Sequence, residues 1–139
     1  LYWQLHPEQP QDNLRCQMKV DADGNFQIAT IRPVPYEIPT DGPVWLDLVQ
    51  PAGRSSWRAA HYHLIVNAPG HRTLVTELFD AEDSYIESDA VFGVREPLVR
   101  KFEATDDAAA CALLGVDGPQ CLIMSIDIRL QPEGGRTTS

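Results

Sequence analysis

Basic residues, cysteines and long apolar runs are all scarce in this sequence of 139 residues. Lysine and arginine together number 11 against 20 aspartates and glutamates, so the formal net charge is −9. A protein without a basic face gains little from counterion release, which argues against nucleic acid and anionic membranes as partners. No apolar run approaches the roughly 20 residues that would cross a bilayer. A small neutral molecule is the kind of partner that remains compatible with this charge.

Only three cysteines occur, at Cys16, Cys111 and Cys121. An odd, sparse count without a Cys-x-x-Cys pair is not the pattern of a disulfide framework. We therefore expect three buried thiols in a reducing compartment, and a cytoplasmic location for the protein.

Short apolar segments separated by glycine and proline make up most of the chain, a pattern typical of all-β proteins. The sequence predicts a β-sandwich of mostly antiparallel strands, with long proline-rich and acidic loops and at most one or two short helices. One domain is expected over residues 1–133, followed by a disordered tail at 134–139. Strands are predicted at residues 14–20, 26–30, 44–49, 61–66, 74–79, 90–94, 98–102 and 122–130, and a helix capped by Thr105 at residues 105–114.

The clearest chemical signal is the pair His61 and His63. Residues two apart in a strand project from the same face, so both imidazoles can chelate one metal ion. The neighbouring residues are apolar, and two unpartnered imidazoles in a buried strand would be destabilising. The alternative is a pair of solvent-facing histidines on an edge strand, as in a non-catalytic β-sandwich binding module.

Two types of residue could complete a metal site around these histidines. Glu77 could supply the carboxylate of a cupin-like or zinc-dependent site, although no cysteine is spaced for a Cys/His zinc site. Tyrosine is the other hard anionic ligand, and Tyr36 lies in a stretch that four prolines make stiff and extended. The residues alone leave both options open.

Three segments together resemble the intradiol ring-cleavage dioxygenases. They are Arg-Pro-Val-Pro-Tyr-Glu-Ile-Pro-Thr-Asp-Gly-Pro at residues 32–43, Arg-Ala-Ala-His-Tyr-His at 58–63 with Ala-Pro-Gly-His at 68–71, and residues 80–94. The last segment is most similar to the hydroxyquinol 1,2-dioxygenase branch. The resemblance covers roughly residues 2–102.

This resemblance implies an enzyme with a mononuclear non-haem Fe(III) held by Tyr2, Tyr36, His61 and His63. Such an enzyme inserts both atoms of O2 between the two hydroxylated carbons of a catechol-type ring, hydroxyquinol included, and forms a cis,cis-muconate-type diacid. Tyr36 would also act as a general base, and Arg58 would stabilise negative charge on the substrate.

Other family positions imply that Arg58, Glu77, Ala90 and Val91 contact the substrate. Glu77 departs from the family, because catechol enzymes often carry glutamine there and hydroxyquinol enzymes carry histidine. The chain is also expected to lack the family's N-terminal part with its helical dimerisation segment, which leaves a homodimer open for the complete protein.

Overall fold

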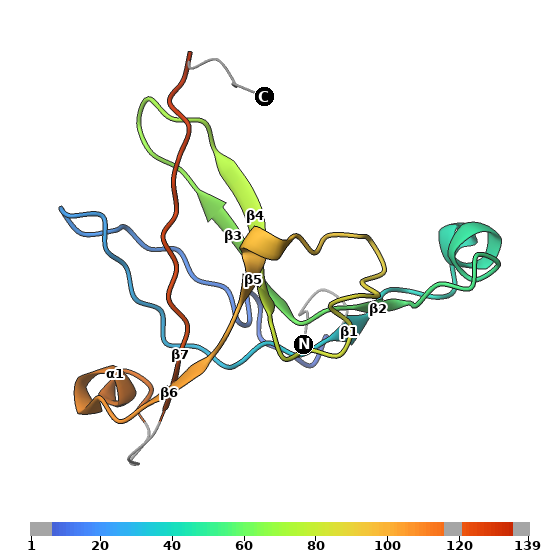
Figure 1. Cartoon of the computed structure of the whole chain (residues 1–139), viewed down its shortest axis with the longest axis horizontal. Coiled ribbons are helices and arrows are strands. Elements are labelled where there is room, and N and C mark those ends of the chain that lie inside the picture. The colour runs from blue at the N-terminus through green and yellow to red at the C-terminus, as the bar shows by residue number, and fades with distance from the viewer. Residues whose placement is uncertain (1–6, 116–120, 135–139) are drawn as a thin grey trace.

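The computed structural model describes residues 7–115 and 121–134, and within them regular structure is confined to short strands and helices (Figure 1). Three small sheets are formed by β1 (Tyr36–Glu37) with β2 (Trp57–Arg58), by β3 (His61–Val66) with β4 (Leu74–Asp80) and β5 (Val99–Arg100), and by β6 (Glu103–Thr105) with β7 (Cys121–Ile123). Among these described strands, the pairing is antiparallel except between β4 and β5. The predicted all-β class with mostly antiparallel strands is confirmed.

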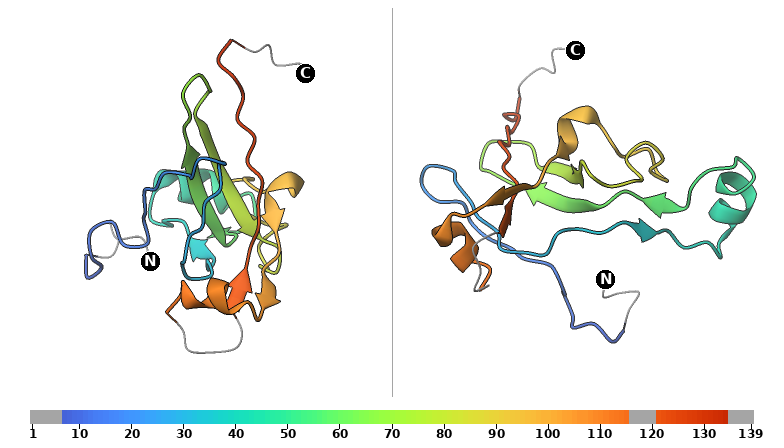
Figure 2. Two further views of the ribbon diagram at one scale, coloured as in Figure 1. Left: turned by 90° about the vertical axis from the view of Figure 1, so that its left-hand side faces the viewer. Right: turned by 60° about the horizontal axis from the view of Figure 1, so that its bottom comes forward.

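The helices of the described chain are short and lie outside the sheets. They are η1 (Val44–Val49), η2 (Glu96–Leu98) and α1 (Ala108–Ala112). Helices η1 and α1 lie at opposite ends of the molecule in both Figure 1 and the right-hand view of Figure 2. None of these helices is long and apolar enough to cross a membrane.

The hairpin of β3 and β4 is the longest paired element, and it confirms the strands predicted at residues 61–66 and 74–79. Its register places His61 opposite Phe79, and His63 opposite Glu77. The turn between the strands contains Gly70, whose φ of 69° is a conformation that glycine adopts without strain. The alternation of side chains along a strand therefore puts both histidines and Glu77 on one face.

A small apolar core lies where this hairpin meets β2. Phe79 is fully buried and its ring centroid lies 5.4 Å from that of His61. The buried apolar residues of the described chain are Ala59, Ala60, Leu78, Phe79, Ala90, Cys111 and Cys121. Ala59 and Ala60, which precede His61, have small side chains and are buried, so His61 begins β3 in a closely packed environment.

The strand predicted at residues 44–49 is wrong, because this segment forms the π-helix η1. Pro43 begins it with helical φ and ψ, and the Gln50 N–H donates to the Trp45 carbonyl at 2.9 Å. The described chain places no strand beside these residues, so their backbone groups pair locally instead.

The strands predicted at residues 14–20 and 26–30 are also wrong, although a turn does lie between the two segments. The Asp21 carboxylate accepts hydrogen bonds from the backbone N–H groups of Asp23 at 3.0 Å and Asn25 at 2.7 Å. The flanking segments run without ladder pairing in the described structure, and Leu14 has a φ of 60°. Their alternation reflects exposed apolar side chains, not a buried sheet face.

Four further predicted elements are absent, displaced or shortened. Residues 90–94 form a turn followed by irregular chain, with a φ of 55° at Phe92, and not a strand. The strands at 98–102 and 122–130 shrink to β5 and β7. The helix begins after Asp107, whose carboxylate accepts from the Ala109 N–H at 2.9 Å, so Asp107 replaces Thr105 as the cap. Most of the predicted tail lies outside the described residues.

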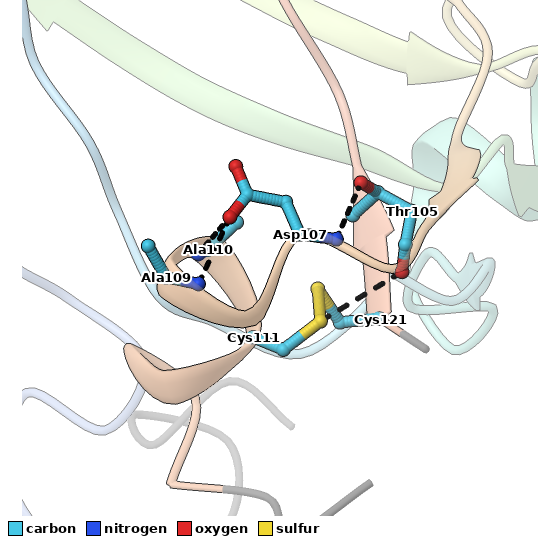
Figure 3. The surroundings of a disulfide bond; sticks show 6 residues. All are labelled: Thr105, Asp107, Ala109, Ala110, Cys111 and Cys121. Atoms are coloured by element: carbon cyan, nitrogen blue, oxygen red, sulfur yellow. Dashed lines mark hydrogen bonds between the residues drawn. A yellow bond between two sulfur atoms is a disulfide. The ribbon is translucent and has the colours of Figure 1, made fainter. Parts of the chain in front are cut away.

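The expectation of three buried thiols is wrong. Cys111 on α1 forms a disulfide with Cys121 on β7 (Figure 3). Their Cα atoms lie 5.4 Å apart, and Cys16 is exposed. The pairing of Thr105 with Cys121 in the β6–β7 ladder brings the start of β7 back beside the helix. This proximity arises from tertiary structure, so the spacing of the cysteines does not indicate it.

Candidate metal centre

Two histidines and one glutamate bring their donor atoms together on one face of the β3–β4 hairpin. The Nε2 atoms of His61 and His63 lie 3.2 Å apart. An oxygen of Glu77, Oε1, lies 3.3 Å from the His63 Nε2 and 3.8 Å from the His61 Nε2. Among the described residues, this is the group of histidine, cysteine and acidic side chains that could hold a metal ion.

His61 is fixed in one orientation. Its side chain is 2% exposed, and its Nδ1 donates to the Ala59 carbonyl at 2.5 Å. A proton on Nδ1 leaves the lone pair of Nε2 free to bind a metal. Burial lowers the pKa of His61, and the nearby charge of Arg58 lowers it further, which favours this neutral form. His63, with a side chain 63% exposed, completes the pair from the solvent side.

Arg58 is the central cation of this region and is buried on β2. Its Nη2 donates to Glu77 Oε2 at 2.7 Å, and its Nε donates to Asp89 Oδ1 at 2.8 Å. Burial lowers the pKa of Arg58, but the hydrogen bond and charge of Asp89 outweigh burial and raise it overall. Arg58 therefore stays positively charged and bridges the carboxylates of Glu77 and Asp89.

Asp89 is the residue that sequence reasoning missed. Its carboxylate accepts from Arg58 Nε, from the Ala59 N–H at 3.1 Å and from the Gly93 N–H at 2.8 Å. Burial raises the pKa of Asp89, yet these hydrogen bonds outweigh it and lower the pKa below its usual value. The sequence offered no spacing rule that would join an aspartate at the end of an acidic loop to Arg58.

Tyr36 reaches the same region through the two-residue ladder of β1 and β2, in which it pairs with Arg58. Its ring centroid lies 5.6 Å from that of His61, and its hydroxyl lies 3.5 Å from Arg58 Nη1. The side chain is 45% exposed. The predicted association of Tyr36, Arg58 and the two histidines is thus present in space.

The remaining predicted site residues are placed less closely. Ala90 is buried, whereas Val91 is exposed. A hollow of about 470 Å³ lies along the loop that follows Ile86, and it shares Asp89 with the site but neither histidine. Tyr2, the fourth predicted ligand, lies outside the described residues.

The donor set fits a metal ion of the first transition row. Two nitrogens bound to one ion at about 2.0–2.1 Å and near-tetrahedral angles lie roughly 3.3 Å apart, close to the observed separation of the His61 and His63 Nε2 atoms. Imidazole suits iron and zinc, and a phenolate from Tyr36 would add the hard anionic character that ferric iron prefers.

Comparison with known proteins decides the family. The model of the family described as Dioxygenase matches residues 1–132. The chain belongs to the intradiol ring-cleavage dioxygenases. A curated family member, hydroxyquinol 1,2-dioxygenase of Rhizobium sp. strain MTP-10005, is 46% identical over 107 residues, which are 77% of this chain and 36% of that protein.

Solved intradiol dioxygenase structures resemble the fold as well. Hydroxyquinol 1,2-dioxygenase from Pseudomonas putida DLL-E4 superposes with a TM-score of 0.79 at 43% identity, over 91% of this chain and 44% of that one. Catechol 1,2-dioxygenase from Acinetobacter sp. ADP1 gives a TM-score of 0.69 at 34% identity, over 81% of this chain and 36% of that one. The chain therefore spans less than half the length of these relatives.

Proposed function

We propose that this chain is the iron-binding part of an enzyme that cleaves a catechol-type ring between its two hydroxylated carbons. The observation that carries the proposal is the convergence of the His61 and His63 Nε2 atoms, 3.2 Å apart, beside the ring of Tyr36. Similarity to hydroxyquinol 1,2-dioxygenases supports hydroxyquinol as one substrate of this type. Tyr2, Tyr36, His61 and His63 would hold Fe(III).

Each of the described residues has a distinct task in this proposal. When bound, ferric iron would make the chelated ring reactive toward O2, and the product would be a cis,cis-muconate-type diacid. His61 binds through Nε2, since its Nδ1 is committed to Ala59. The phenolate oxygen of Tyr36 can accept a proton from a ring hydroxyl as the substrate binds. The guanidinium of Arg58, 3.5 Å from that oxygen, stabilises negative charge on the substrate.

We propose that the substrate ring is bounded by Arg58, Glu77, Ala90 and Val91. Arg58 already donates to the carboxylates of Asp89 and Glu77 through Nε and Nη2, so Nη1, 3.5 Å from the Tyr36 hydroxyl, is the group that can face negative charge on the substrate. A substrate that brings its own carboxylate would meet a cation that already has two carboxylate partners. This supports an uncharged polyhydroxylated ring as the substrate.

Absorption spectroscopy tests the proposal directly. The iron-loaded chain should show a broad visible phenolate-to-Fe(III) charge-transfer band, which shifts when a catechol is added without oxygen. Tyr36→Phe should remove or strongly weaken the band, because a ligand phenolate is lost. Tyr85→Phe is the matched control, since the Tyr85 ring stacks on Trp57, and it should keep the band. Bound iron without visible colour in the unmodified chain would refute the two-tyrosine site.

For the complete protein we also propose a homodimer and a cytoplasmic location, and the Cys111–Cys121 disulfide, of a kind rare in reducing compartments, makes the location the more demanding of the two to test. Sedimentation of the full-length protein tests the first, and fractionation of the producing cells tests the second. Neither outcome alters the assignment of the metal ligands, which depends on the spectroscopy above.

A further inference from the structure

The Glu77 side chain is directed at the two histidines of the site, which contact with a substrate alone would not explain. It lies directly opposite His63 in the β3–β4 ladder. Its Oε1 faces both imidazoles, at 3.3 Å from the Nε2 of His63 and 3.8 Å from that of His61. With a side chain only 19% exposed, the carboxylate is held within the site and does not extend into solvent.

The three donor atoms have the spacing of ligands around one ion. Together with the 3.2 Å between the two Nε2 atoms, these distances define a nearly equilateral triangle. A point equally distant from all three atoms in their plane lies about 2.0 Å from each, and zinc bonds to nitrogen and carboxylate oxygen measure roughly 2.0–2.2 Å. Two histidines and one carboxylate also form a recurrent ligand set for divalent iron.

The surroundings hold Glu77 in this orientation. Its other oxygen, Oε2, accepts from Arg58 Nη2 at 2.7 Å, which leaves Oε1 directed at the histidines. The backbone of Gly93 packs against this pair, because a Cβ there would lie 3.0 Å from Glu77 Oε2 and 3.2 Å from Arg58 Nη2. Arg58 thus orients a ligand carboxylate in the way that outer-shell partners orient metal ligands.

We propose that His61, His63 and Glu77 form a self-sufficient three-donor site for a divalent first-row metal ion, independent of any tyrosine. This goes beyond the proposed function, because it assigns Glu77 to the metal and predicts binding in a chain that lacks the Tyr36 phenolate. The probe is Co²⁺, which reports its coordination through visible d–d absorption and does not oxidise under ordinary handling.

The test is a Co²⁺ titration of the metal-free chain, followed by calorimetry and by d–d absorption. The unmodified chain should bind one equivalent. Glu77→Gln keeps the size of the side chain but removes the anionic donor, and should weaken binding by about 100-fold or more, since losing even an outer-shell partner costs 10–100-fold. Glu103→Gln, at an exposed glutamate on β6, is the matched control and should bind within about twofold of the unmodified chain.

Tyr36→Phe separates this inference from the ferric site. It should lose the Fe(III) charge-transfer band yet keep Co²⁺ binding, with less than about a tenfold loss. Co²⁺ binding that survives Glu77→Gln unchanged, or that disappears in Tyr36→Phe, would overturn the three-donor site. If the ferric chain is colourless while Co²⁺ binding follows the pattern above, the proposed dioxygenase ligands fail and this inference stands.

A second measurement does not depend on any variant's folding. In a crystal structure of the unmodified chain with Co²⁺, Glu77 Oε1 should lie within about 2.2 Å of the ion. An ion bound by both histidines, with Glu77 retained only on Arg58, would overturn the proposal.

Discussion

Removal of the Asp89 carboxylate should destabilise the chain more than any change at an exposed acidic residue. The side chain is 2% exposed and accepts hydrogen bonds from Arg58 Nε and from the backbone N–H groups of Ala59 and Gly93. Asp89→Ala deletes all three interactions without supplying another acceptor. Arg58 would then remain buried with Glu77 as its one described carboxylate partner.

The expected loss in the free energy of unfolding follows from the groups that Asp89→Ala leaves without an acceptor. Breaking a buried ion pair by removing one partner costs about 3–5 kcal/mol, because an uncompensated charge stays buried. The two backbone N–H groups add to this, at about 1–3 kcal/mol for each group that finds no water. Retention of Glu77 beside Arg58 reduces the first contribution, so we expect a total loss of about 3–5 kcal/mol.

Urea unfolding at pH 7, followed by circular dichroism, measures this loss. Asp106→Ala is the control, since Asp106 is exposed, and it should change the free energy of unfolding by less than about 0.5 kcal/mol. Asp89→Asn should fall between the two, because the amide keeps one acceptor oxygen. A loss below about 1 kcal/mol for Asp89→Ala would show that Arg58 does not depend on this carboxylate.

Three further outcomes are expected. Gly93→Ala should lower the free energy of unfolding by about 1–3 kcal/mol in urea, because its Cβ would lie 3.0 Å from a Glu77 oxygen, and an unchanged value would contradict this packing. Arg32→Ala should also lower the free energy of unfolding in the same assay, by less than Asp89→Ala, since Arg32 donates twice to buried Asp80, at 2.5 and 2.9 Å, from a solvent-exposed position. Burial raises the pKa values of Asp80 and Asp89, but hydrogen bonds outweigh it and lower both. Their stabilisation is therefore present above about pH 4 and is lost as pH falls through the lowered values, which circular dichroism between pH 7 and 2 would follow.

The sequence predicted the parts of the site that depend on local geometry. The two-residue spacing of His61 and His63 determines that they share a strand face, whatever the rest of the fold does. The sequence indicates Glu77 only as an available carboxylate and does not specify which strand residue it faces. The β3–β4 register supplies this, because it places Glu77 opposite His63.

The parts that could not be predicted depend on contacts between distant segments. Asp89 meets Arg58 across 31 residues, and its loop gave no periodic pattern. Cys111 and Cys121 pair because β7 returns beside α1, which no cysteine motif indicates. The segment from Val44 to Val49 has the apolar alternation of a strand, but a strand also needs a partner, and the described chain supplies none.

The residues of the candidate site are held by two sheets of different length, so partial unfolding should separate them in a fixed order. His61, His63 and Glu77 are held by one six-pair ladder within the β3–β4 hairpin. Tyr36 is held by a ladder of only two pairs, between β1 and β2. Short ladders open at a lower free energy than long ones, so partial unfolding should withdraw the tyrosine before it separates the other three donors. Tyr36, the described phenolate of the proposed ferric site, therefore depends on the weaker of the two sheets.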